Sequence, residues 1–167
     1  MHISVINIVS SFVIALVLHE LGHFVAARVC RIKVIEAGLG WGPKLLSAQI
    51  LGVDYHLRLL PIGAYVRMDM AALQKCPLVQ QLFVLLAGIA VNLILAVVAW
   101  GSFFGTLNLV LAAANLFPIY QHDGWKSGMV IFRRVFRRPS PLVEWSFTLS
   151  AGLMGFMLLA RGMFTVL

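Results

Sequence analysis

A continuous apolar segment from about Ile3 to Val29 contains the sequence His19-Glu20-Leu21-Gly22-His23. As a helix, this segment is longer than the hydrocarbon core of a bilayer, which is roughly 30 Å thick. Residues four apart lie on one face of a helix, so His19 and His23 can offer ring nitrogens to one metal ion, with Glu20 beside them. In catalytic zinc sites three protein ligands leave a fourth position for water, and a nearby carboxylate takes the proton of that water. The segment therefore predicts a membrane-spanning helix with a zinc site and a general base.

The same five-residue pattern also arises by chance in soluble helices, where its histidines are ordinary surface or core residues. Here no charged residue occurs between Ile3 and Leu18, and the sequence stays apolar from Phe24 to Ala27. Placing ionisable side chains in such a segment costs on the order of a few kcal/mol each, so they mark a functional site by default. We therefore favour a metal site over a proton relay or a structural role.

The composition excludes an ordinary soluble domain, because 61% of the 167 residues are hydrophobic and only 11% are charged. A soluble domain carries about a quarter charged residues. The net charge of +7 resembles that of a nucleic-acid-binding protein, yet the basic residues fall in particular loops, which membrane topology explains better. We therefore expect the lipid bilayer, and no nucleic acid, as a partner. Cys30 and Cys76 are far apart in the sequence and are predicted to be reduced thiols.

The apolar segments predict a mainly α-helical, polytopic membrane protein that forms a single domain over residues 1–167. The third of about four transmembrane helices is short and is broken at Pro118, because proline removes a backbone donor. Irregular backbone at membrane depth is tolerated only where it lines a cavity, so this break is expected to mark a site. The predicted spans are residues 3–29, 78–100, 106–122 and 142–164, and residues 124–138 are predicted to form an amphipathic interfacial helix.

A small membrane-associated β element is predicted between the first two spans, at about residues 31–67. Apolar and polar residues alternate from Val53 to Leu60, which is typical of a strand with one apolar face. The glycine-rich stretch 38–43 is interpreted as a turn between strands, and residues 60–66 as a further strand or loop. An open strand edge is not tolerated in lipid, so the sheet must lie in protein or interface, or pair with an extended segment.

The basic residues predict the orientation in the membrane. Of the 13 lysines and arginines, only Arg161 lies near the C-terminal end. The other 12 belong to the two long loops between predicted spans, counting Arg28 at the very end of the first span. By the positive-inside rule both loops are cytoplasmic, so both termini lie outside and the metal motif lies toward the cytoplasmic face. We expect an integral protein of a prokaryotic cytoplasmic membrane.

Asp123 is the best candidate for the third zinc ligand, because it follows the break in the third span on the predicted cytoplasmic side. The chain has six acidic residues in all, and zinc accepts carboxylate oxygen. The alternative is that Asp123 merely caps the following helix. His122 and His56 are the rival ligands, although a solvent-facing ring is favoured for His56.

Asn92 and Asn115 are predicted to be buried amides, which need hydrogen-bond partners. Contact between helices and a role in holding the substrate backbone or an oxyanion are about equally favoured for them. Gly88 lies four residues before Asn92, a spacing that suits close helix packing.

Taken together, these motifs resemble the site-2 protease family of intramembrane zinc metalloproteases. They occur in order over nearly the whole chain: His19-Glu20-Leu21-Gly22-His23, Pro61-Ile62-Gly63-Ala64-Tyr65-Val66, Gly88-x-x-x-Asn92, Asn115-x-x-Pro118 and Asp123-Gly124. The resemblance implies zinc ligation by His19, His23 and Asp123, with Glu20 as the catalytic base. It also implies that the β element, including Gly63, Ala64 and Tyr65, pairs with an unwound substrate strand. The sequence departs from the family at Ala64 and His122, and the linker 69–77 is too short for a PDZ or CBS domain, so we expect a minimal core.

The predicted function is hydrolysis of peptide bonds within or next to transmembrane segments of other proteins, with one zinc ion. A transmembrane substrate protein and an accessory membrane protein are the expected partners. The alternatives are a metal or proton transporter and a catalytically silent scaffold homologue. A transporter predicts polar residues through both leaflets, whereas they gather here in the cytoplasmic half; a silent scaffold predicts loss of Glu20 or a ligand, and none is lost.

Overall fold

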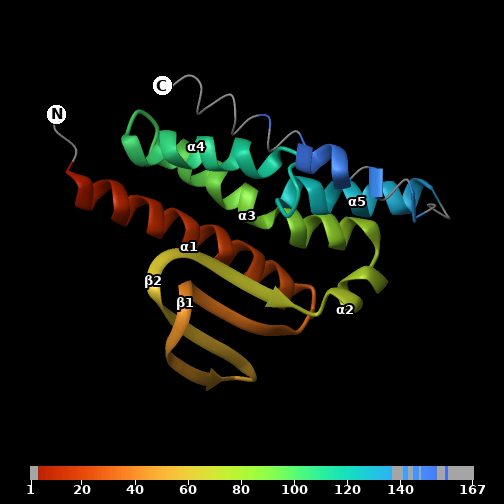
Figure 1. Cartoon of the computed structure of the whole chain (residues 1–167), viewed down its shortest axis with the longest axis horizontal. Helices are drawn as coiled ribbons and strands as arrows, with labels where there is room; N and C mark the ends of the chain where they lie inside the picture. Colours follow the sequence, from red (N-terminus) through yellow and green to blue (C-terminus); the bar gives the residue numbers. More distant parts are fainter. Residues whose placement is uncertain (1–3, 137–140, 143–144, 147, 154–156, 158–167) are drawn as a thin grey trace.

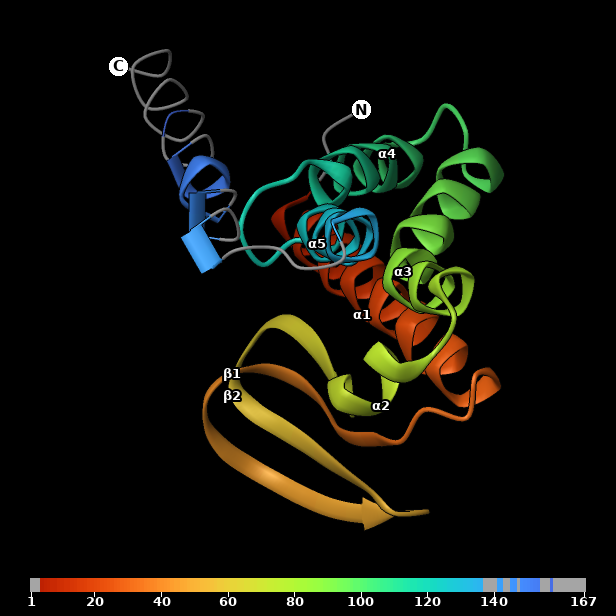
Figure 2. The same cartoon turned by 90° about the vertical axis from the view of Figure 1, so that its right-hand side faces the viewer.

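The computed structural model describes residues 4–136, 141–142, 145–146, 148–153 and 157. Helix α1 lies between a group of helices and a long β-hairpin (Figures 1 and 2). In chain order the elements are α1 (Val5–Val29), β1 (Val34–Ile50), β2 (Val53–Met68), α2 (Met70–Lys75), α3 (Leu78–Val98), α4 (Phe103–Leu116) and α5 (Asp123–Val135).

Helices α1 and α3 correspond to the first two predicted spans and are long and apolar enough to cross a membrane. Much of their apolar surface faces outward, as at Ile6, Val97 and Val98, which are 78%, 70% and 79% exposed. Such a surface is costly in water and favourable in lipid. Helix α1 begins at Ser4, whose hydroxyl accepts a hydrogen bond from the backbone N–H of Asn7.

The predicted count of four spans is not confirmed. Helix α4 begins earlier than predicted and ends at Leu116, so its 14 residues fall short of the roughly 20 that a span needs. The helix break is present, because the chain leaves α4 at Phe117-Pro118 and α5 begins only at Asp123. The fourth predicted span, 142–164, falls largely outside the described residues. Where the interfacial helix is predicted, the structure has the strongly amphipathic helix α5, and its position at the membrane interface stays a prediction.

The hairpin differs from the sequence prediction in the position of its turn. The turn lies at Leu51-Gly52, where both residues have positive φ, as a tight turn between antiparallel strands requires. The stretch 38–43 was predicted as a turn and is instead part of β1, where Gly40 (φ 92°) and Gly42 (φ 89°) let the strand bend. Gly40 and Gly42 therefore bend the strand and do not reverse the direction of the chain.

The bend lets the two strands pair twice. Residues 36–39 of β1 pair on one side with residues 64–67 of β2 and on the other with residues 54–57, and residues 44–50 pair with 53–58. Residues 64–67 therefore form one edge of the sheet. Two residues anchor the hairpin in the main apolar core: Val34 at the start of β1 and Val53 just after the turn. There they meet the end of α1, α2 and α3 through Ala27, Leu73 and Val84.

Candidate metal centre

His19, His23 and Asp123 come together between α1 and the start of α5. The Nε2 atoms of His19 and His23 each lie 3.0 Å from Oδ2 of Asp123 and 3.3 Å from each other. All three residues are buried. The helical spacing places the two rings on one face of α1, whereas Asp123 lies 100 residues after His23 in the sequence. These are the three residues that the sequence predicts as ligands.

The geometry of these three atoms fits a zinc ion. Zinc bonds of about 2.0–2.1 Å in tetrahedral directions put neighbouring ligand atoms roughly 3.3 Å apart. Nδ1 of His23 lies 2.8 Å from the backbone carbonyl oxygen of Val84, to which it donates, so a neutral His23 ring presents a lone pair at Nε2. Lone pairs on Nε2 of the two histidines and on Oδ2 of Asp123 would repel one another at these distances unless a positive charge lay between them. A histidine and carboxylate donor set of this kind suits zinc.

Asp123 is the first residue of α5, and the residue at the N-cap position is His122. The alternative that Asp123 only caps this helix is therefore wrong. Its Oδ1 atom accepts a hydrogen bond of 3.2 Å from Nζ of Lys126. Burial opposes ionisation of Asp123, yet the close contacts with the rings of His19 and His23 and the charge of Lys126 bring its pKa well below the usual range. Asp123 is thus a carboxylate at neutral pH, the form that binds a metal ion.

The two rival histidines are not part of the group of three. His122 is the N-cap residue of α5, next to Asp123, and is not among the described residues whose ligand atoms come together. His56 lies in the hairpin. The ring of His56 is only 10% exposed and lies 3.3 Å from Oε1 of Glu36, so the expectation of a solvent-facing ring is wrong. The hydroxyl of Tyr65 donates to Glu36 at 2.6 Å. This hydrogen bond, together with the charge of Arg67, holds the pKa of Glu36 below its usual range. His56 therefore belongs to an ionic cluster that ties the hairpin strands together.

Gly88 explains how α3 approaches the candidate metal ligands so closely. A Cβ atom at this position would lie 2.6 Å from Nε2 of His19 and would also collide with Nε2 of His23. Gly22 has the same function on the opposite helix, because a Cβ there would lie 2.8 Å from the backbone oxygen of Ala87. The predicted close contact at Gly88 is thus between α3 and the ligands themselves.

Three of the four asparagines lie in α3 and α4 and have different environments. Asn92 is completely buried on α3, and neither atom of its amide has a hydrogen-bond partner among the described residues. It lies four residues after Gly88 and so shares the face of α3 that turns toward α1. Asn115 donates to the carbonyl of Leu111 within its own helix. Asn108, which sequence reasoning missed, is also completely buried and donates to Phe104.

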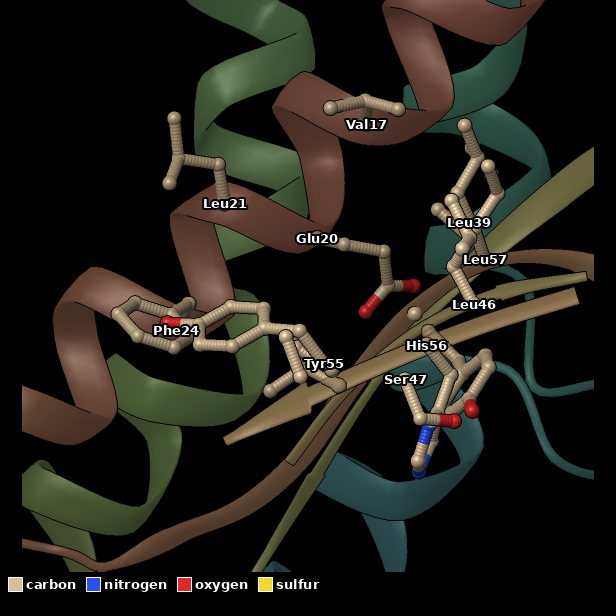
Figure 3. Close-up of a pocket in the computed structure, with 16 residues that line it drawn as sticks. Val17, Glu20, Leu21, Phe24, Leu39, Leu46, Ser47, Tyr55, His56 and Leu57 are labelled. Carbon is tan, nitrogen blue, oxygen red and sulfur yellow. Dashed lines mark hydrogen bonds between the residues drawn. The ribbon is translucent and has the colours of Figure 1, made fainter. Parts of the chain in front are cut away.

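Glu20 lies where two cavities meet. The larger, of about 650 Å³, is bounded by α1 and the hairpin, and Glu20 projects into it from α1 (Figure 3). The smaller, of about 420 Å³, is lined by Glu20, His23 and Asp123. Tyr65 and Val66 line both cavities, while Ala64 lines the larger one. The edge segment of β2 therefore runs past Glu20 and the candidate metal ligands His23 and Asp123.

The fold and the site define a helical metal-binding protein of the His-Glu-x-x-His class. The chain belongs to peptidase family M50, whose family model matches residues 7–105, more than half of the chain. This membership confirms the resemblance to the site-2 protease family that the motifs predict.

Similar proteins carry the name "Putative zinc metalloprotease". One from Clostridium acetobutylicum is 37% identical over 103 residues, which cover 57% of this chain and 30% of that protein. Others are from Clostridium perfringens, 34% identical over 53% of this chain and 29% of that protein, and from Synechocystis, 35% identical over 50% and 26%. The chain thus spans less than a third of the length of these relatives.

Proposed function

We propose that this chain is a zinc peptidase core that cleaves peptide bonds within or next to transmembrane segments. The observation that carries the proposal is the buried convergence of His19, His23 and Asp123 beside Glu20. Family membership and the names of the relatives support it.

Each residue of the site has its own role in the proposed reaction. His19, His23 and Asp123 would hold the zinc ion, which when bound polarises a substrate carbonyl and acidifies water. The carboxylate of Glu20 accepts the proton of the attacking water and returns it to the leaving amine. Asn92, whose amide has no hydrogen-bond partner among the described residues, is the candidate to steady the substrate backbone or the oxyanion.

The membrane placement rests on the outward apolar faces of α1 and α3 and on the distribution of basic residues. Both loops rich in lysine and arginine are assigned to the cytoplasm, so the site lies toward that face and the termini lie outside. A substrate within the bilayer reaches the site from the lipid and must unwind, because a helix hides its carbonyls in hydrogen bonds.

The larger cavity is the proposed position of the substrate segment next to the cleaved bond. Its walls carry apolar side chains from both sides, including Val17 and Leu21 of α1 and Leu39, Leu46 and Leu57 of the hairpin (Figure 3). The edge at Gly63, Ala64 and Tyr65 offers backbone groups to an extended chain. An apolar segment from a transmembrane helix fits these walls.

A tryptophan at position 46 tests this assignment. Leu46→Trp fills part of the cavity, so we expect kcat/KM for a transmembrane substrate to fall about tenfold while zinc content stays unchanged. Leu45→Trp is the matched control, because neighbouring strand residues point to opposite faces and Leu45 does not line the cavity. Equal effects of the two substitutions on kcat/KM would show that the cavity does not bind substrate.

Metal removal tests the function itself. In liposomes with a co-reconstituted transmembrane substrate, phenanthroline is expected to abolish cleavage, and one equivalent of zinc is expected to restore it. Ion flux in the same liposomes without any cleavage would favour the transporter instead. Cleavage that persists in zinc-free protein would exclude the proposed chemistry.

A further inference from the structure

A third cavity, of about 360 Å³, lies away from the metal centre, where the end of α2, the first turn of α3 and the last turns of α5 meet. Three positively charged side chains line it: Lys75 from α2, and Arg133 and Arg134 from α5. None of the described residues that line it is acidic. A hollow in which cations from two separate elements converge attracts anions.

The start of α3 adds to this potential. Its N-cap is Pro77, which provides no side-chain hydrogen bond to the first turn. Gln81, which also lines the cavity, does not cap this turn, because its Nε2 donates to the carbonyl of Cys76 at 2.8 Å. The positive end of a 21-residue helix therefore adds to the three cationic side chains around the cavity.

The position of the cavity indicates the kind of anion. It lies at the end where α3, one of the two candidate membrane spans, begins, and Val79 in that first turn is 77% exposed. This is the level of the phospholipid head groups on the proposed cytoplasmic face. The amphipathic helix α5 reaches this level at its C-terminal end, where its last turn carries basic residues. Basic pockets beside membrane helices at this depth bind anionic head groups.

We propose that this cavity binds the phosphate group of an anionic phospholipid, with Lys75, Arg133 and Arg134 around the phosphate. The inference rests on the membrane placement proposed above, but not on the peptidase activity. The bound lipid would link the end of α5 to the start of α3. Helix α5 begins with Asp123, and α3 packs on His19 and His23 through Gly88.

The test uses the full chain purified in detergent and measures lipid retention by native mass spectrometry. We expect one phosphatidylglycerol per chain, little phosphatidylcholine, and no competition from millimolar inorganic phosphate. Lys75→Gln with Arg134→Gln is expected to weaken phosphatidylglycerol binding about 25-fold, at about fivefold for each charge. The matched control, Arg31→Gln with Lys33→Gln, removes two exposed charges that do not line the cavity and is expected to change binding less than twofold.

An equal loss of phosphatidylglycerol binding in the two double variants would overturn the proposal, because it would show that binding depends on net charge alone. Displacement of the lipid by inorganic phosphate would overturn it in favour of a free anion. Thermal unfolding in phosphatidylcholine checks that both variants are folded. Failure of the wild-type chain to sediment with membranes would overturn the membrane placement and this site together, whereas loss of cleavage with lipid binding intact would concern the peptidase proposal alone.

Discussion

Replacing Glu20 by glutamine is expected to lower cleavage of a co-expressed transmembrane substrate by about 10³-fold, within the range that general-base catalysis contributes. Glutamine has nearly the same shape as glutamate but does not accept a proton from water. Because His19, His23 and Asp123 remain, zinc content is expected to stay near one ion per chain. Cleavage is followed by immunoblot of the substrate, and zinc by elemental analysis of the purified protein.

The combination of the two measurements decides the role of Glu20. Lost cleavage with retained zinc assigns proton transfer to Glu20, whereas lost zinc in the same variant would assign it to holding the site together. Wild-type rates of cleavage with zinc bound would reject Glu20 as the base. Glu20→Asp is a useful companion, because it keeps the carboxylate but withdraws it by one methylene, and partial activity is expected.

Gly88→Ala is expected to remove zinc almost completely, although it adds only one methyl group. The new Cβ would lie 2.6 Å from Nε2 of His19 and closer still to Nε2 of His23. Neither the backbone of α3 nor the rings can move away without losing the geometry that the metal needs, because the interior is closely packed. We expect less than about a tenth of the wild-type zinc and a corresponding loss of cleavage.

Gly152→Ala is the matched control, since no described atom beyond its chain neighbours and its own helix backbone lies within 4 Å of a Cβ at this position. It should retain zinc and cleavage at wild-type levels. If Gly88→Ala also kept its zinc and its activity, the approach of α3 to the ligands would be looser than the structure describes. Circular dichroism of both variants separates loss of metal from loss of fold.

The hairpin shows where sequence patterns were insufficient. The alternation from Val53 to Leu60 correctly predicts a strand, because side-chain direction in a strand is local. The glycines of 38–43 were assigned to a turn, since glycine with positive φ serves turns and bends alike. Only the pairing of residues 36–39 on both sides shows that β1 continues through them. The same limit applies to α4, whose hydropathy does not reveal that it ends at Leu116.

The sequence by itself determined the arrangement of His19, Glu20 and His23, because helical periodicity fixes the relative directions of residues so close in the chain. It also indicated Asp123 as a ligand but left His122 and His56 as rivals. Only the tertiary structure decided that Oδ2 of Asp123 lies 3.0 Å from both rings, that Gly88 packs against them, and that Glu20 lies between two cavities. These relations join residues up to 104 positions apart, and such contacts depend on how whole helices pack rather than on any local pattern.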